Sequence, residues 1–264
     1  MNELHLQDKF LLPFFCNDLG YNEVKANTVT NSLIIEEDLE FFISETDLNK
    51  KAYDTLLKKY KGDRALLLKE LIELIQERIG SSRNMALFIN ANKSITLQGV
   101  KLHLFYPSDS VIHGNKLFEQ NIFSVVQELP YKFKFQGEQI FSFRPDIVLF
   151  VNGIYLGYSE LKSNYTSQNA SKNGRGKVIK DYFEAVKAYH QHIDSNDMLS
   201  ENEKLALRKD FLKVFEKAIH ITTTDIGETY VIRTIADYFD EILTTCREGK
   251  FDREEIEKKA HSVF

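Results

Sequence analysis

The sequence of 264 residues predicts an α/β fold in which a mixed β-sheet is flanked by helices. Amphipathic helical patterns at residues 3–20 and 177–193 enclose a series of short strand-like segments. Two of these segments are apolar, rich in β-branched residues and joined by Asn152-Gly153, the strongest short hairpin signal. A hairpin lying between helical segments is typical of a sheet that has helices packed on it.

The N-terminal part is predicted to contain a helix followed by short strands. Apolar side chains recur at a spacing of three or four over residues 3–20, and Pro13 would kink or divide the helix. Residues 22–35 are expected to form short strands, of which residues 33–35 are the clearest.

A helical insertion is expected at about residues 36–80. Asp47 or Asn49 could cap a first helix, and Asp63 a second one, because short polar side chains accept hydrogen bonds from free N–H groups at a helix start. The first of these helices is mostly polar and is expected to pack at the periphery.

Strand patterns predominate from residue 85 to the end of the hairpin, and the rest of the chain is predicted to contain both helices and strands. We expect one domain over residues 1–264, with a core at about 85–193 and a C-terminal α/β extension at 204–264 that belongs to a longer protein. The expected strands are residues 85–89, 95–97, 100–106, 124–129, 132–135, 139–143, 147–151, 154–162, 218–224 and a segment from 230. The expected helices are residues 177–193, 204–215, 235–246 and 250–264, and a polar loop is expected at 163–176.

Composition excludes several classes of protein. The chain has two cysteines, Cys16 and Cys246, and no apolar run of about 18 residues, which argues against a disulfide framework and a membrane span. We therefore expect a soluble protein of the cytoplasm without a membrane partner. The net charge of −5 disfavours a uniformly basic nucleic-acid-binding surface. Basic residues nevertheless outnumber acidic ones between Lys162 and Lys187, where a phosphate backbone could pass.

The outer ends of the hairpin carry the residues with chemical potential. Asp146 precedes the first apolar run, and Glu160 and Lys162 end the second. Two carboxylates can hold a hard divalent cation, and a lysine beside them can orient or activate a water, which suits metal-assisted phosphodiester hydrolysis. The alternative is an ordinary hairpin whose charged ends face water.

The spacing places a condition on the metal site. A two-residue turn would pair Val151 with Ile154, and the two carboxylates would then lie on opposite faces of the sheet. We therefore predict a bulge within residues 144–160. It could arise from a three-residue loop with Gly153 left-handed, or from a bulge at Pro145-Asp146.

This arrangement resembles the N-terminal nuclease domain of the R (HsdR) subunit of type I restriction enzymes, a branch of the PD-(D/E)xK superfamily. The resemblance rests on residues 121–128, on Arg144-Pro145-Asp146 with the run that follows, and on Glu160-Leu161-Lys162. It covers most of the chain and implies a restriction-endonuclease-like mixed sheet with a helical insertion. It also implies a Mg²⁺-dependent type I site-specific deoxyribonuclease.

The resemblance implies roles for particular residues. Asp146, Glu160 and the Leu161 carbonyl would bind Mg²⁺, and Lys162 would orient the hydrolytic water. The first helix would add Asp8 or Gln7 to the metal site. The family often has Gln-x-x-x-Tyr on the helix after the hairpin, whereas valine stands four residues before Tyr182 in this chain. Contacts to the DNA backbone are expected from four residues instead: Arg175, Lys177, Lys180 and Tyr182.

Implied partners are double-stranded DNA, modification and specificity subunits, and a helicase motor. ATP would act only through that motor, because this chain has no Walker A motif. Two alternative functions remain open, a non-catalytic DNA-binding or scaffold module and a standalone repair or defence nuclease.

Overall fold

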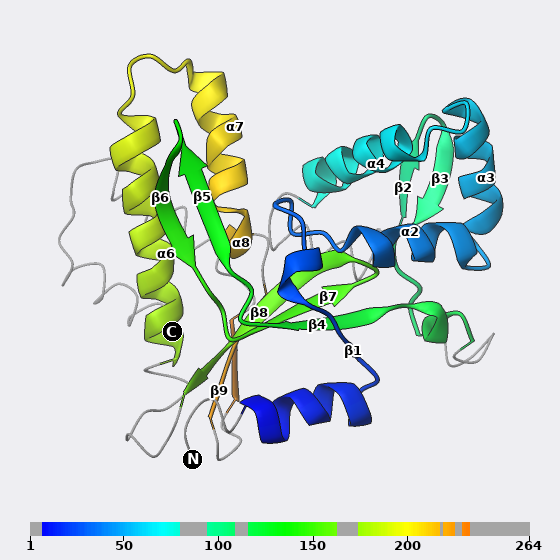
Figure 1. The fold of residues 1–264 in the computed structure, drawn as a ribbon, viewed down its shortest axis with the longest axis horizontal. Helices are drawn as coiled ribbons and strands as arrows, with labels where there is room; N and C mark the ends of the chain where they lie inside the picture. Colours follow the sequence, from blue (N-terminus) through cyan, green and yellow to red (C-terminus); the bar gives the residue numbers. More distant parts are fainter. Residues whose placement is uncertain are drawn as a thin grey trace.

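A mixed six-stranded sheet forms the centre of the computed structural model, with strand order β1-β4-β7-β8-β9-β10 (Figure 1). The structure describes residues 7–79, 94–108, 116–162, 174–216, 219–224 and 229–232. The strands are β1 (Asn22–Glu23), β4 (Phe123–Gln127), β7 (Ile147–Val151), β8 (Ile154–Lys162), β9 (Ile219–Thr224) and β10 (Thr229–Ile232). The expected strand 85–89, most of the polar loop and the helices at 235–246 and 250–264 lie outside the described residues.

The sheet combines antiparallel and parallel strand pairs. The hairpin strands β7 and β8 are antiparallel, as are β4 with β7 and β9 with β10, whereas β1 with β4 and β8 with β9 are parallel. A parallel neighbour requires a long crossover, and the helices α6 (Arg175–Tyr189), α7 (Glu201–Phe211) and α8 (Lys213–Glu216) lie between β8 and β9. The predicted mixed sheet with flanking helices is confirmed.

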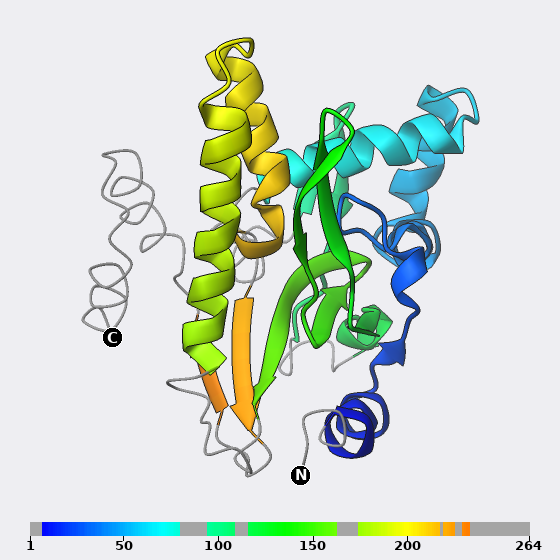
Figure 2. The ribbon, with the colours of Figure 1, turned by 60° about the vertical axis from the view of Figure 1, so that its left-hand side comes forward.

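The two faces of the sheet are covered by different helices. Val148, Phe150 and Tyr158 pack with Val178 and Tyr182 of α6 in one core cluster. On the other face, a cluster that includes Ile147, Leu149 and Leu161 packs against partly buried side chains of the N-terminal helix. In Figure 2 the sheet accordingly stands between α6 and the N-terminal helix. Burial on both faces explains why β7 reads as a continuous apolar run.

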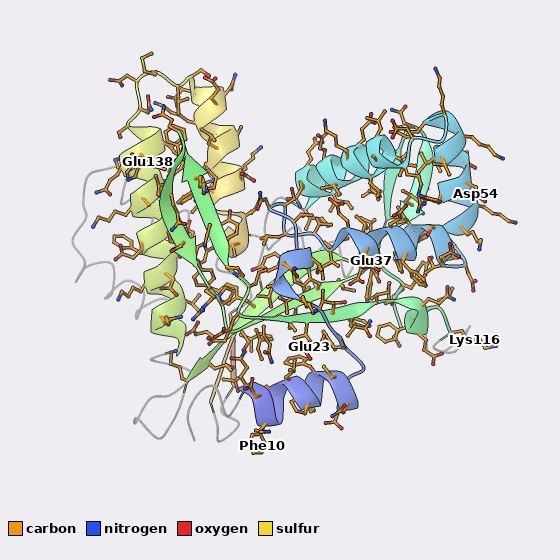
Figure 3. All side chains as sticks on the ribbon, in the orientation of Figure 1. Phe10, Glu23, Glu37, Asp54, Lys116 and Glu138 are labelled. Carbon is orange, nitrogen blue, oxygen red and sulfur yellow. The ribbon has the colours of Figure 1, made fainter. Side chains whose placement is uncertain are left out.

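The N-terminal helix consists of two π-helical stretches, Gln7–Leu11 and Phe14–Asp18. Leu12 and Pro13 join these stretches with helical geometry, so the predicted division of the helix at Pro13 is wrong. Figure 3 shows Phe10 on the outer side of this helix, and its side chain is half exposed. The strand expected at residues 33–35 is wrong. Ile34 and Ile35 form only isolated bridges, with Ile154 of β8 and with Val29, because Leu33 has a left-handed φ of 57° and α2 begins at Glu36.

A second hydrophobic core cluster lies in the helical insertion. It contains side chains of the helices α2 (Glu36–Glu45), α3 (Lys50–Lys59) and α4 (Arg64–Arg78) and of the hairpin strands β2 (Ser94–Leu97) and β3 (Val100–His103). The Asp63 side chain accepts from the Leu66 N–H at 3.0 Å, as predicted for a cap. Asn49 stands at the start of α3 but does not cap it, because its side chain instead forms two 2.8 Å hydrogen bonds with the backbone of His103.

A separate hairpin, β5 (Tyr131–Phe135) and β6 (Glu138–Phe143), rises beside α6 and α7 (Figure 1). Its inner residues Phe133 and Phe143 join the same core cluster as α6 and α8. Tyr131 donates to the Asp210 carbonyl at 2.7 Å, and this bond ties the hairpin to α7. The hairpin therefore supports the covering helices rather than extending the central sheet.

The turn between β7 and β8 is fixed by hydrogen bonds to the segments that follow β3 and precede β4. Asn152 and Gly153 both have positive φ, 50° and 75°, as a two-residue type I′ turn requires. The buried Asn152 side chain donates to the Leu104 carbonyl and to Asn121 at 2.9 Å each, and accepts from the Ile122 N–H. Asn121 thus has a structural role, which joins the β7–β8 turn to the start of β4.

Replacing Gly153 tests how strictly this turn is packed. A Cβ at Gly153 would overlap the Ile35 carbonyl oxygen and would lie 2.7 Å from the Leu39 nitrogen, whereas Gly99 has the same φ of +75° and no atom within 4 Å. Gly99→Ala should cost about 1–2 kcal/mol from backbone strain alone. Gly153→Ala should cost about 1–3 kcal/mol more, because it adds overpacking. Urea unfolding of both variants measures the difference, and equal losses would contradict the packing.

Candidate active site

One extra residue in β8 brings the two predicted carboxylates together. Val151 pairs with Ile154 and Phe150 with Tyr155, but Leu149 pairs with Gly157, so Leu156 is a bulge. The shifted register pairs Ile147 with Ser159, and one further step would put Asp146 opposite Glu160. Residues directly opposite share a face of the sheet.

The predicted bulge within residues 144–160 is therefore confirmed, but both suggested positions are wrong. The turn keeps two residues, and the strand is irregular at Leu156 rather than at Pro145-Asp146. The reason is that Asn152 and Gly153 are locked by their neighbours, so the register cannot be changed at the turn.

Asp146 is positioned by the backbone around it. Its Oδ2 accepts from the Leu161 N–H at 2.7 Å, so the carboxylate lies against the end of β8. Gln7 of the N-terminal helix is buried and donates from Nε2 to the Asp146 carbonyl at 3.3 Å. Glu128 donates from its backbone N–H to the same carbonyl at 2.9 Å. These bonds hold the residue although it stands just before β7.

Glu160 is 2% exposed, and its two carboxylate oxygens have different surroundings. Oε1 lies 2.7 Å from Lys162 Nζ and 2.6 Å from Lys177 Nζ. Oε2 is buried and accepts no hydrogen bond from the described residues. A buried carboxylate oxygen without a donor is costly, so this atom marks a place where a cation or a donor would be stabilised.

The surroundings of the site shift several pKa values. Burial and the nearby Glu160 raise the pKa of Asp146 to about 6, against the opposing effects of the Leu161 N–H and the two lysines. Burial also raises the pKa of Asp181. Burial lowers the pKa of Lys177, but the nearby carboxylates of Glu160, Asp181 and Asp146 together outweigh it and the net shift is upward. Negative charge is therefore crowded at this site and would be relieved by a cation.

The residues fit a magnesium ion. Asp146 and Glu160 supply carboxylates, and the Leu161 carbonyl faces the same space, since it accepts from Lys162 Nζ at 2.7 Å. Among the described residues no group of three or more His, Cys, Asp and Glu side chains is arranged for a metal. Magnesium does not need such a group, because it keeps several waters and is bound through one or two carboxylates plus substrate phosphate.

Of the other predicted site residues, Gln7 lies at the site, whereas Asp8 and Lys180 are exposed. Asp8 is exposed on the N-terminal helix, whereas Gln7 points to Asp146, so the structure favours Gln7 as the contribution of this helix. Gln7 contacts the Asp146 backbone rather than its carboxylate. Lys180 is exposed on α6. The Arg175 side chain lies outside the described residues.

Tyr182 requires a correction. It was expected to contact DNA, but it is 0% exposed and packs against Phe215 with ring centroids 5.6 Å apart. It therefore stabilises the core. The contact of Lys177 with Glu160 is not predicted by the sequence, because it depends on how α6 packs across the sheet.

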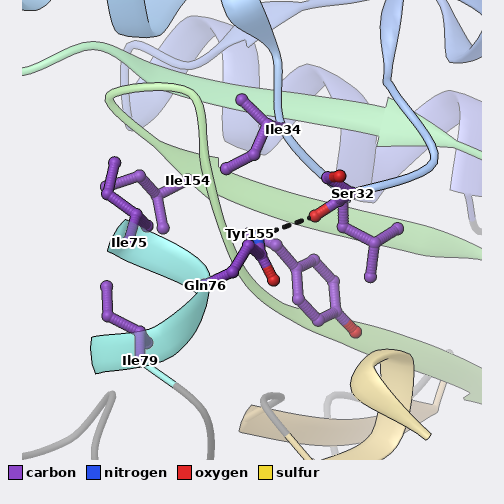
Figure 4. Close-up of a pocket in the computed structure, with 8 residues that line it drawn as sticks. Ser32, Ile34, Ile75, Gln76, Ile79, Ile154 and Tyr155 are labelled. Atoms are coloured by element: carbon purple, nitrogen blue, oxygen red, sulfur yellow. Dashed lines mark hydrogen bonds between the residues drawn. The ribbon is translucent and has the colours of Figure 1, made fainter. Parts of the chain in front are cut away.

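A small cavity at the other end of the hairpin offers no second site. It lies between α4 and the β7–β8 turn, has a volume of about 10 Å³ and is lined by Ile75, Ile79 and Ile154 with Gln76 at one side (Figure 4). Gln76 donates to the Ser32 carbonyl at 2.9 Å. A space of this size holds one water at most.

Comparison with known protein families gave a match over most of the chain. The model of the type I restriction enzyme R protein N terminus covers residues 1–225 of the 264. The chain belongs to this family. Membership assigns the protein to a restriction system, and the resemblance of residues 121–162 to the N terminus of the type I R subunit is confirmed. Searches of curated proteins and of solved structures found no significant match. The described residues include no helix with the length and apolar character that a membrane span needs.

Asp146→Asn should stabilise the metal-free protein. A folded-state pKa of about 6, above the ordinary 3.8, means that the folded protein binds more protons, so stability falls as pH rises from 4 to 6. At pH 7.5 in EDTA the amide should raise the free energy of unfolding by about 1–3 kcal/mol. At pH 4 the two proteins should be nearly equal, because the wild-type carboxyl is then largely protonated. Denaturant unfolding at both pH values measures this, and a less stable variant at pH 7.5 would contradict it.

Proposed function

We propose that this chain is a Mg²⁺-dependent endonuclease domain of the PD-(D/E)xK type, which hydrolyses phosphodiester bonds of double-stranded DNA. The observation that carries the proposal is the shifted register of β7 and β8, which brings Asp146 and Glu160 to one face of the sheet with Lys162 beside Glu160. An ordinary hairpin with solvated ends does not explain a buried Glu160 oxygen that has no donor among the described residues.

The chain's own residues would divide the work as follows. Asp146, Glu160 and the Leu161 carbonyl hold Mg²⁺, which when bound polarises the phosphodiester and favours ionisation of water. Lys162 orients the attacking water toward phosphorus and stabilises the negative charge that develops there. Gln7 and the Leu161 N–H keep Asp146 in place during the reaction. Burial of Glu160 and Lys162 strengthens each of these interactions, because water screens them less.

Family membership supports the restriction role over a standalone repair nuclease. Within a restriction complex the chain would act on DNA presented by modification and specificity subunits and a helicase motor. The second candidate, a scaffold that keeps the fold without catalysis, requires no carboxylate pair. Nothing in the site favours it, since Lys162 contacts Glu160 and the Asp146 carboxylate is bound by the Leu161 N–H between them.

Nicking of supercoiled plasmid tests the proposal. The wild-type chain, alone and together with its ATP-driven motor, should nick DNA in Mg²⁺ and not in EDTA. Asp146→Ala, Glu160→Gln and Lys162→Ala should each lower the rate by about 10²-fold or more, the size of a lost electrostatic or acid–base contribution. Lys209→Ala removes an exposed lysine on α7 and should leave the rate unchanged.

The possible results separate the candidates. Cleavage that persists in Asp146→Ala and Lys162→Ala would place the chemistry elsewhere. Absence of cleavage by the wild type, even with the motor present, would favour the scaffold.

A further inference from the structure

We propose that Lys177 is a positioning residue that binds Glu160 in the metal-free site, and that a divalent cation releases it to bind a DNA phosphate beside the scissile bond. The inference rests on the proposed nuclease function and deepens it. Metal loading and DNA binding would then be coupled through one lysine.

The position of Lys177 is fixed by the packing of α6. Val178 follows it and is buried, and Tyr182 of the same helix is fully buried against the core. The helix covers the sheet face that carries Tyr158, and Glu160 belongs to this face because it is two residues further along β8. Lys177 therefore reaches Glu160 from a neighbouring element, and their 2.6 Å contact does not depend on a mobile loop.

Glu160 cannot keep all of its partners when a divalent cation binds. Its Oε1 already contacts two ammonium groups, and a cation at Oε2 and Asp146 would place further positive charge beside both. A cation and two ammonium groups bound to one buried carboxylate repel one another strongly, because little water screens them. One of the two lysines must then move away.

Lys177 is the lysine that is free to leave. Its side chain is 38% exposed, whereas that of Lys162 is 9% exposed and also bonds the Leu161 carbonyl. Asp181, 3.5 Å from Lys177 on the same helix, offers a second contact outside the metal site. Lys177 can therefore turn toward solvent while its helix stays in place.

The balance of charge points to an anion as its next partner. Asp146, Glu160 and Asp181 carry three negative charges when ionised, and Lys162 and Lys177 carry two positive ones. A divalent cation makes the cluster net positive by one charge, and a DNA phosphate would restore neutrality. Without the ammonium of Lys177 the loaded site would be neutral and would attract phosphate less.

Lys177→Gln tests the inference, because its two expected effects have opposite signs. Removing the competing ammonium should tighten Mn²⁺ binding, measured by titration calorimetry, by about three- to tenfold, the size of one partly exposed ion pair. The same variant should bind a DNA duplex about three- to tenfold more weakly in Ca²⁺, with a salt dependence reduced by about one phosphate contact. A residue that only stabilises the fold would not tighten metal binding.

Two further variants serve as controls. Lys180→Gln removes the same charge from the same helix at an exposed position, and should leave Mn²⁺ affinity at the wild-type value. Lys177→Arg keeps the charge and should restore both wild-type affinities to within about twofold.

The outcomes separate this inference from the proposed function. If the wild type binds Mn²⁺ and Asp146→Ala does not, the metal site stands, and an unchanged or weaker Mn²⁺ affinity in Lys177→Gln then overturns the role of Lys177 alone. Equal tightening in Lys180→Gln would reduce the effect to general electrostatics and would also overturn it. If the wild type binds no divalent cation, both proposals fail.

Discussion

Because side chains alternate between the faces of a strand, Asp146 and Glu160 can share a face only if the two sides of their hairpin differ by one residue. Leu156 is that residue, and every contact of the candidate site depends on it. Without the bulge, Ser159 would stand opposite Asp146, and Glu160 would point to the face covered by the N-terminal helix. The Leu161 N–H could then not bind the Asp146 carboxylate as it does.

The hairpin can carry this irregularity because its turn is held so firmly. Asn152 binds the backbone before β4 and after β3, and Gly153 packs against the start of α2. The helical insertion, although distant from the carboxylates, thus helps to set their register. The helices that cover the two faces of the sheet each contribute one residue to the site. Helix α6 places Lys177 against Glu160, and the N-terminal helix places Gln7 against the Asp146 carbonyl.

The electrostatics of the candidate site destabilise the metal-free folded protein. The half-buried carboxylate of Asp146 lies near the buried Glu160, and the raised pKa of Asp146 reflects the destabilisation that burial and this like charge cause. Lysines relieve it only in part, since Glu160 Oε2 has no donor among the described residues. Such local violations of satisfied burial are expected where a protein binds a cation or performs chemistry.

Local patterns in the sequence determined the hairpin, the cap at Asp63 and the carboxylates at the hairpin ends, because turn chemistry, capping and period-two alternation act over a few residues. They also showed that a bulge was needed, but not where, since several positions satisfy the same alternation. Only the tertiary structure decided that Leu156 is the bulge, that Ile34 and Ile35 form isolated bridges rather than a strand, and which side of α6 faces the sheet. Tyr182 and Lys177 are five residues apart, about 140° around the helix axis, so only one of them could point straight into the core. That choice depends on how the helix packs across the sheet, which no short-range pattern encodes.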